Sequence, residues 1–140
     1  MSEILFHMVA GGPRPVAPFS HAVEAGGFVF VTGQMPDSPE APGVLPDGIE
    51  AQTRAVMRNL SVVLGGIGLA LAHTVMARIY LAEFARDYAA LNALWPSFFA
   101  PGRLPARTTV GVTALASGAL VEIDLVASRT SEALLPETRS

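Results

Sequence analysis

The sequence predicts an α+β fold that combines two helices with a largely antiparallel or mixed sheet. Residues 49–67 carry apolar side chains at helical spacing and a second helical segment follows at 84–99, whereas the other apolar segments are short and mostly alternating. Helices interspersed among such strands are typical of this layer architecture. The 140 residues are 51% hydrophobic and 15% charged. We therefore expect one domain over 1–128 and a flexible tail over 129–140.

The N-terminal third is expected to supply three strands. Residues 4–9 form the first, and a rigid Gly/Pro loop follows at 11–18. Residues 22–25 and 28–32 are expected to pair as a hairpin across Gly26-Gly27. The next segment, 35–48, holds four prolines and two glycines and is expected to be a surface loop.

Asp47 is expected to begin the first helix, because it precedes Glu50 by three residues in a variant of the capping box. The glycine cluster at 65–68 is expected to end the helix. Its core-facing stripe comprises Ile49, Val56, Leu60, Val63, Leu64 and Ile67.

The most apolar stretch, 62–82, is interrupted by glycines, a histidine and an arginine, and its period changes midway. It therefore predicts a helix end, a turn and a buried strand over 74–81 rather than a membrane span. In that strand Val75, Ala77 and Ile79 are expected to face the core together with Leu81.

A second helix is expected over 84–99, with Pro96 kinking or restarting it. Two further alternating strands are expected over 107–114 and 119–127, and the tail follows Arg129. The predicted order is strand, hairpin, helix, strand, helix and two strands.

Composition excludes several kinds of chemistry. All nine cationic residues are arginines and there is no cysteine, which rules out Schiff-base lysines, thiol nucleophiles, disulfides and thiolate metal sites. The net charge of −3 and the pI near 5.5 do not suggest nucleic-acid binding. The N-terminus lacks the features of a signal peptide, so we expect a cytoplasmic protein without membrane association. Few charges cover this apolar chain, which favours burial of part of its surface in an oligomer.

Two ionisable residues stand at notable positions. Arg107 opens a strand, and Glu122 shares the polar side of the last strand with Asp124. One interpretation is a solvated strand face. The other is an Arg–Glu pair on neighbouring strands in a cleft, where the arginine would bind a carboxylate and the glutamate would hold or deprotonate a water molecule.

Other candidates have simpler interpretations. His7, His21 and His73 show no metal-binding spacing and are expected to be surface or hydrogen-bonded histidines. Ser20 beside His21 does not form a catalytic triad, because adjacent strand residues point to opposite faces. Trp95 and the phenylalanines that follow it are expected to be core or interface anchors.

Four sequence blocks resemble the YjgF/RidA family of reactive-intermediate (enamine/imine) deaminases. The blocks are APFSHAVEAGGFVFVTGQMP (17–36), IEAQTRAVMRNLSVVL (49–64), DYAALNALWPSFF (87–99) and LPARTTVGVTALASGALVEIDLVA (104–127). The most specific is the last, in which P-A-R-[ST] is followed some fifteen residues later by V-E-I-[ED]. The resemblance covers nearly the whole chain.

The resemblance implies a chorismate-mutase-like fold, with two helices on one face of the sheet, and a homotrimer with sites between subunits. Arg107 would bind the carboxylate of a 2-imino acid and Glu122 would position the attacking water. Further residues implied in substrate binding are Phe19, Thr32, Gly33, Asn92 and Thr109. Phe19 and Thr109 depart from the tyrosine and cysteine of many members, which affects the expected substrate range.

The implied activity is the hydrolysis of 2-aminoacrylate or 2-iminopropanoate to a 2-keto acid and ammonia, with no cofactor and no metal. One alternative is a pathway-specific deaminase acting on 2-aminomuconate or a pyrimidine-derived aminoacrylate. Another is a small-molecule-binding trimer without turnover. An RNA-cleaving or translation-inhibiting role, also attached to the family, is disfavoured by the acidic pI and the absence of lysine.

Overall fold

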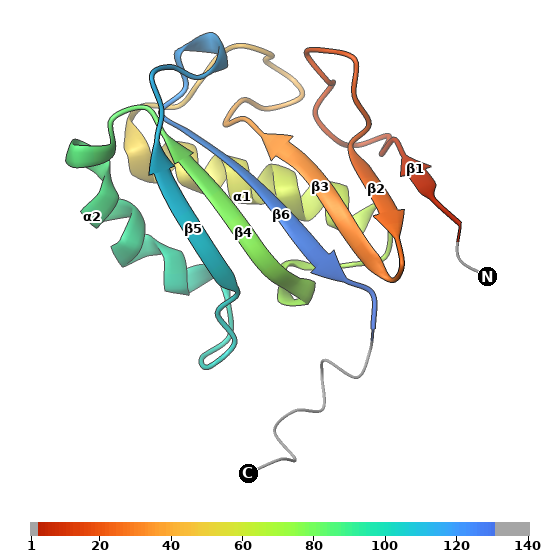
Figure 1. Cartoon of the computed structure of the whole chain (residues 1–140). Coiled ribbons are helices and arrows are strands. Elements are labelled where there is room, and N and C mark those ends of the chain that lie inside the picture. Colours follow the sequence, from red (N-terminus) through yellow and green to blue (C-terminus); the bar gives the residue numbers. More distant parts are fainter. Residues whose placement is uncertain (1–2, 131–140) are drawn as a thin grey trace.

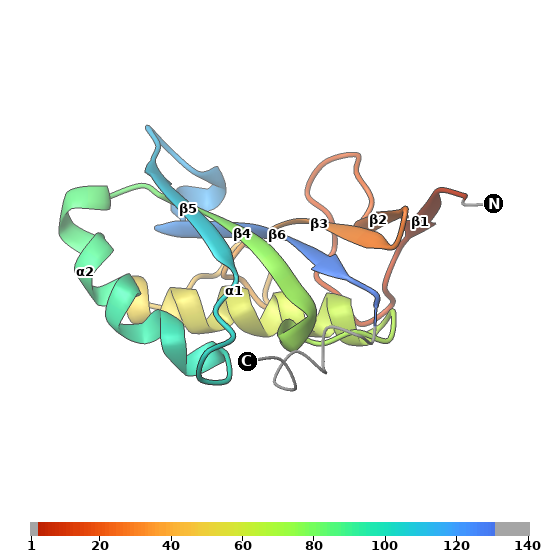
Figure 2. The ribbon, with the colours of Figure 1, turned by 60° about the horizontal axis from the view of Figure 1, so that its bottom comes forward.

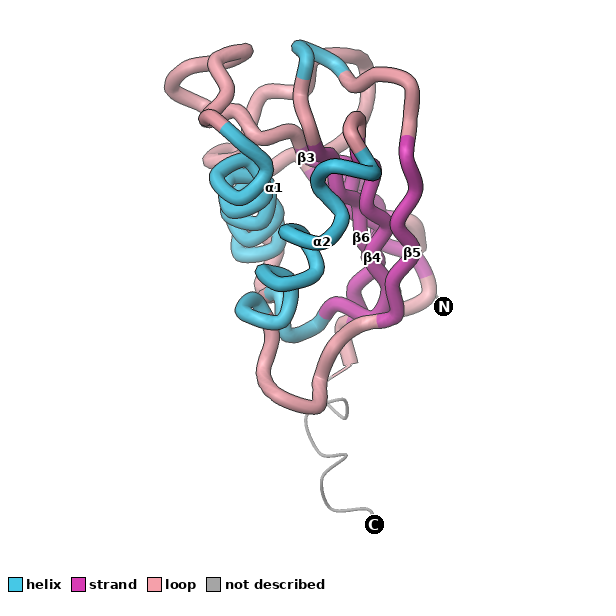
Figure 3. The backbone as a smooth tube through the Cα atoms, turned by 90° about the vertical axis from the view of Figure 1, so that its left-hand side faces the viewer, coloured by secondary structure: helices cyan, strands magenta, loops and turns pink. Residues whose placement is uncertain are grey.

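The computed structural model describes residues 3–130, which form two layers (Figure 1). Two helices, α1 and α2, pack on one face of a six-stranded sheet, and no helix formed by residues 3–130 covers the opposite face (Figures 2 and 3). The strands are β1 (Leu5–His7), β2 (Ala22–Ala25), β3 (Phe28–Gln34), β4 (Thr74–Leu81), β5 (Ala106–Gly111) and β6 (Val121–Ser128). The helices are α1 (Gly48–Gly65) and α2 (Phe84–Leu94), with short 3-10 helices over Leu71–His73, Trp95–Phe98 and Ala116–Gly118.

The sheet has the strand order β1-β2-β3-β6-β4-β5. All neighbouring strands pair antiparallel except β4 and β5, which run parallel and are connected through α2. The sheet is therefore mixed and mostly antiparallel, and the predicted fold class is confirmed. The last strand in sequence, β6, lies in the middle of the sheet, so β5 and β6 are not neighbours.

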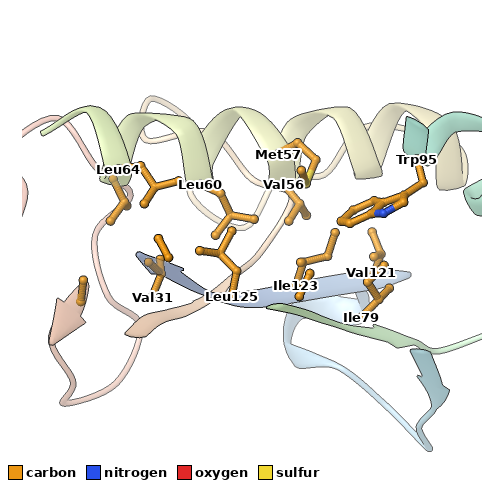
Figure 4. Close-up of a cluster of buried hydrophobic side chains, with 14 of the residues drawn as sticks. Val31, Val56, Met57, Leu60, Leu64, Ile79, Trp95, Val121, Ile123 and Leu125 are labelled. Carbon is orange, nitrogen blue, oxygen red and sulfur yellow. The ribbon is translucent and has the colours of Figure 1, made fainter. Parts of the chain in front are cut away.

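The core lies between α1 and the sheet (Figure 4). Val56, Leu60 and Leu64 project from α1 and are fully buried against β-branched and leucine side chains of the central strands. On β6, Val121, Ile123 and Leu125 alternate toward this core, as the sequence predicts. Burial of these aliphatic side chains is the main force that holds the helix layer on the sheet.

Two local predictions fail. Asp47 occupies the position before α1, but its side chain makes no capping hydrogen bond, so the capping box does not form. In β4, Thr74 is buried and Val75 is 40% exposed, the reverse of the expected alternation. The cause is an irregularity in the pairing with β6 between Thr74 and Met76, which shifts the side-chain period by one residue.

Pro96 restarts the second helical segment rather than kinking it. The α-helix ends at Leu94, and a 3-10 helix with proline in its first turn continues through Phe98. Proline is tolerated there because the first N–H groups of a helical turn have no intrahelical partner.

No helix in residues 3–130 is long and apolar enough to span a membrane, and 62–82 is a helix end, a turn and a strand, as predicted. The tail expected over 129–140 lies outside the described residues from 131 onward, and the boundary at 128 stays a prediction.

The uncovered face of the sheet carries an apolar row that crosses all six strands. Cross-strand partners on this row share the face opposite the helices. The row consists of Phe6, Val23, Phe30, Val126, Met76 and Ala106. Phe6 is 70% exposed and Phe30 50% exposed in the single chain. The single chain therefore presents a connected apolar strip on the face of the sheet opposite the helices.

Replacing Leu60 with alanine tests the described core. Leu60 is fully buried, so the substitution should lower the free energy of unfolding by about 3 kcal/mol. Val62 lies on the same helix with 37% of its surface exposed, and Val62→Ala should cost less than about 1 kcal/mol. Urea unfolding at one fixed protein concentration measures both values, and equal losses would contradict the described orientation of α1.

Candidate functional site

The first group of predicted site residues, the Arg107 cluster (Asn92, Arg107 and Thr109), lies between β5 and α2. Arg107 pairs with the buried Ala77 of β4, which places its side chain on the helix-covered face. Its Nη2 donates a hydrogen bond of 2.6 Å to Oδ1 of Asn92, near the C-terminal end of α2. A guanidinium group has five N–H donors, so this bond leaves the others available to an anion.

Two aromatic rings of the same helical segment flank Arg107. Its guanidinium carbon lies 5.9 Å from the ring centre of Tyr88 and 5.7 Å from that of Trp95. Both distances are within the range of cation–π attraction. The ring contacts and the Asn92 hydrogen bond together fix the position of the cationic group.

Thr109 completes the Arg107 cluster. It follows Arg107 by two residues on β5, so both side chains lie on the same face of the strand. The Thr109 hydroxyl oxygen is buried and makes no hydrogen bond within residues 3–130. An unpartnered buried hydroxyl next to a guanidinium is a polar group that a ligand could satisfy.

The second group, the Glu122 cluster (Phe19, Thr32, Gly33 and Glu122), lies around the opposite face of the sheet. Glu122 pairs across strands with Tyr80 and is half-buried, and its carboxylate forms no hydrogen bond or ion pair within residues 3–130. Burial, and secondly the negative charge of Asp124, raise the pKa of Glu122 above its ordinary value. The structure therefore presents an unpaired carboxylate with an increased tendency to hold a proton.

Asp124 remains beside Glu122 as a paired carboxylate. Arg78 donates to it from Nε at 2.8 Å and from Nη2 at 3.1 Å, and the Tyr80 hydroxyl donates at 3.0 Å. These bonds occupy Asp124, so of the two carboxylates on this face of β6 only that of Glu122 remains unbonded. The polar side predicted for β6 thus divides into one structural and one available carboxylate.

Gly33 makes room for the Glu122 side chain. A Cβ atom at position 33 would lie 3.0 Å from Cδ of Glu122 and closer still to its carboxylate oxygen. The adjacent Thr32 hydroxyl donates a 2.6 Å hydrogen bond to the Ser20 carbonyl, which ties β3 to the segment carrying Phe19. Phe19 is 40% exposed and lines a surface hollow together with Gly33.

One chain does not bring the two clusters together. Strand β4 separates β5 from β6, so the expectation that Arg107 and Glu122 occupy neighbouring strands is wrong. Their partners on β4, Ala77 and Tyr80, are three residues apart, which corresponds to about 10 Å along the strand. The two side chains also leave the sheet on opposite faces. Within one copy they cannot bind the same small molecule.

His21 has a structural role. His21 is buried, accepts a 2.8 Å hydrogen bond from the Val9 N–H at Nδ1, and therefore donates from Nε2 to the Pro13 carbonyl at 2.6 Å. This confirms the prediction of a hydrogen-bonded histidine. Among residues 3–130, no group of three or more His, Asp or Glu side chains is placed to hold a metal ion.

Solved structures with the same architecture come from several organisms. A Rid-family protein of Yersinia pestis is 30% identical and superposes with a TM-score of 0.83, covering 90% of this chain and 99% of that one. RidA of an Antarctic Psychrobacter is 29% identical with a TM-score of 0.80, covering 87% of this chain and 98% of that one. The fold is therefore that of the Rid proteins.

Sequence comparison agrees with the fold. Residues 10–129 match the family model described as Endoribonuclease L-PSP. A RutC family protein of Pyrococcus horikoshii is 32% identical over 127 residues, 91% of this chain and 98% of the relative. The chloroplastic Reactive Intermediate Deaminase A of Arabidopsis thaliana is 32% identical over 116 residues, 83% of this chain and 61% of the relative. The chain belongs to the YjgF/RidA family.

The partners that surround the two charged groups do not follow from the sequence pattern. Tyr88 was not singled out, and Trp95 was expected to be only a core or interface anchor. The spacing of Tyr88, Asn92 and Trp95, at i, i+4 and i+7, was the signal that they share one helix face. The bonds of Asp124 to Arg78 and Tyr80 required the strand pairing, which the sequence does not specify.

Replacing Glu122 with glutamine should stabilise the protein at neutral pH. Folding raises the pKa of Glu122, so the folded protein holds this proton at pH values where the unfolded chain has lost it. The free energy of unfolding contributed by this group therefore decreases as the pH rises from the ordinary glutamate value through the raised one. Glu122→Gln removes this loss and should unfold at a higher temperature than the wild type at pH 8, with the difference vanishing near pH 3.5.

Thermal unfolding followed by circular dichroism at both pH values measures this difference. Glu40→Gln, at an exposed loop position, is the matched control. It should change the melting temperature by the same small amount at both pH values. A Glu122→Gln variant no more stable than the wild type at pH 8 would contradict the described environment of the carboxylate.

Proposed function

We propose that this protein is a reactive-intermediate deaminase that hydrolyses 2-imino acids, such as 2-iminopropanoate formed from 2-aminoacrylate, to 2-keto acids and ammonia. The observation that carries the proposal is that the two clusters offer complementary chemical groups. One offers a fixed guanidinium with free N–H donors, and the other offers an unpaired carboxylate with a raised pKa. The relative named Reactive Intermediate Deaminase A supports the same class of reaction.

In this proposal Arg107 binds the substrate carboxylate through two parallel, charge-assisted hydrogen bonds. Because Asn92 and the two rings hold the guanidinium, the carboxylate defines where the neighbouring C=N carbon lies. The Thr109 hydroxyl and the adjacent backbone lie on the same side and would contact the substrate near its nitrogen. Phe19 would close the pocket with an apolar ring.

Glu122 would act on water. The ionised carboxylate accepts a proton from a water molecule as the water oxygen bonds to the imine carbon, which gives a tetrahedral carbinolamine. Glu122 returns this proton to the nitrogen and then transfers the carbinolamine hydroxyl proton to the same nitrogen, so that the C–N bond breaks, the C=O bond forms and ammonia leaves. Water and the imino acid thus become a keto acid and ammonia. A pKa above the ordinary glutamate value suits a group that takes and returns a proton, and such catalysis contributes about 10²–10⁴-fold.

We further propose that the active form is a homotrimer in which each site combines the Arg107 cluster of one copy with the Glu122 cluster of another. Two observations support this assembly. A single chain holds the clusters on opposite faces of its sheet, so either cluster alone is incomplete. The apolar row on the uncovered face, with Phe6 and Phe30 largely exposed, would be buried between copies.

A coupled assay tests the reaction. A serine dehydratase generates 2-aminoacrylate, and pyruvate release is followed with and without the protein. The wild type should accelerate release, and Arg107→Ala should lose at least about 100-fold of the acceleration because the carboxylate is no longer bound. Arg54→Ala, an exposed arginine on α1, is the control and should remain active. No acceleration by the wild type, with carboxylate binding retained, would favour a binding protein or a deaminase for another imine.

Mixing two inactive variants tests the shared site. Arg107→Ala retains Glu122, and Glu122→Gln retains Arg107, so co-assembly restores sites in which each copy supplies its intact residue. Each residue is intact in about half of the copies, and random assembly should therefore recover about a quarter of the wild-type activity. The co-expressed variants are compared with each variant alone and with the double variant. If mixed oligomers of confirmed composition recover no activity, the proposal of a site shared between copies is refuted.

A further inference from the structure

Three side chains from α2 and the 3-10 turn that follows it contact one side chain on β5, that of Arg107. Tyr88, Asn92 and Trp95 are spaced at i, i+4 and i+7, and all three contact Arg107. One contributes a hydrogen-bond acceptor at 2.6 Å, and two contribute ring faces within 6 Å. We call these three residues the arginine stripe.

The arginine stripe is itself held by packing. Trp95 is 4% exposed and contacts the rings of Phe98 and Phe99, with ring centres 6.2 and 5.1 Å away. Tyr88 stacks on Phe84 at 4.5 Å. Although α2 ends at Leu94, the backbone of Trp95 keeps helical dihedral angles of −53° and −46°, so its ring continues the stripe past the end of the helix. The Trp95 ring is therefore held by packing, and the Tyr88 ring by its stacking on Phe84, before any ligand binds.

A guanidinium packed over two ring faces is restricted in a particular way. Aromatic faces attract its cationic plane, whereas its N–H donors point outward within that plane. Asn92 occupies one donor and prevents rotation within the plane. An anion can then bind only at the remaining edge, where a planar carboxylate makes two parallel hydrogen bonds. A free arginine side chain would have to be immobilised on binding, which weakens affinity.

We propose that Tyr88 and Trp95 are positioning residues, which with Asn92 preorganise Arg107 for in-plane binding of a carboxylate and thereby set the affinity for the substrate. The inference rests on the proposed role of Arg107 in binding the substrate carboxylate. It adds that ring faces on α2, and not the charge of Arg107 alone, determine this affinity. The Tyr88 ring acts through its face, so its hydroxyl group is dispensable.

Trp95 also supplies the measurement, because it is the only tryptophan in the chain. Its indole lies 5.7 Å from the cation that would receive the ligand, so a bound carboxylate should change its fluorescence. The probe ligand is pyruvate, and acetone, which lacks the carboxylate, is the matched control ligand. The wild type should give a saturable change with pyruvate and none with acetone, and Arg107→Ala should give no change with either. Calorimetry on the same samples provides a second measure of affinity.

The decisive variants remove or keep the Tyr88 ring. Tyr88→Leu should weaken pyruvate binding about tenfold, whereas Tyr88→Phe should stay within about twofold of the wild type. Phe28→Leu removes an exposed ring at the start of β3, outside the arginine stripe, and should also stay within about twofold. In the coupled assay Tyr88→Leu should raise KM with kcat nearly unchanged, because a positioning residue acts on carboxylate binding.

The outcomes separate this inference from the proposed reaction. Unaltered pyruvate binding by Tyr88→Leu, an equal loss in Phe28→Leu, or no pyruvate binding by the wild type would overturn the inference. Tyr88-dependent binding without deamination would refute the proposed reaction and keep the inference. Deamination that is unchanged by the Tyr88→Leu substitution would support the proposed reaction and overturn the inference.

Discussion

The structure depends on the packing of α1 and α2 against only one face of a sheet whose side chains alternate between faces. This single constraint decides the surroundings of every residue on the central strands. On β6 it buries Val121, Ile123 and Leu125 under α1 and leaves Glu122 and Asp124 on the uncovered face. On β5, beside α2, it turns Arg107 toward the helix layer.

The same constraint separates the two charged groups on which the proposed chemistry depends. An arginine and a glutamate close together in one chain would form an ion pair, and each would satisfy the other. Here Arg107 is held by a neutral amide and two rings, and Glu122 has no partner within residues 3–130. Both groups therefore keep their capacity for a ligand, which supports the proposal that a second copy completes the site.

The order and type of the elements could be predicted because they follow from local patterns. The helical stripe of α1, the glycines that end it and the proline that ends α2 act within a few residues. Thr74 and Val75 were assigned to the wrong faces because the pairing irregularity depends on β6, about fifty residues away in sequence. The capping prediction for Asp47 failed because its spacing from Glu50 does not determine where the side chain points.

The strand pattern indicated Arg107 and Glu122, and the family resemblance supplied the other site residues, but neither showed how these residues are distributed in space. Arg107 and Glu122 were expected on neighbouring strands because their strands follow one another in sequence. The crossover through α2 places β4 between them, and this arrangement arises from long-range pairing. The ring contacts of Arg107 also required the packing of α2 on β5, although the spacing of Tyr88, Asn92 and Trp95 could have indicated a shared face.

The contact between Gly33 and Glu122 has a consequence for how such a protein changes over evolutionary time. The carboxylate occupies the space that any side chain at position 33 would need, yet the backbone there is not confined to glycine-only angles. A single codon change to alanine would leave the sheet intact while displacing the acid. Arg107, on the other side of the sheet, would still bind carboxylates. On this scaffold, one added methyl group at position 33 would therefore be enough to turn a protein that catalyses the reaction into one that only binds a carboxylate ligand.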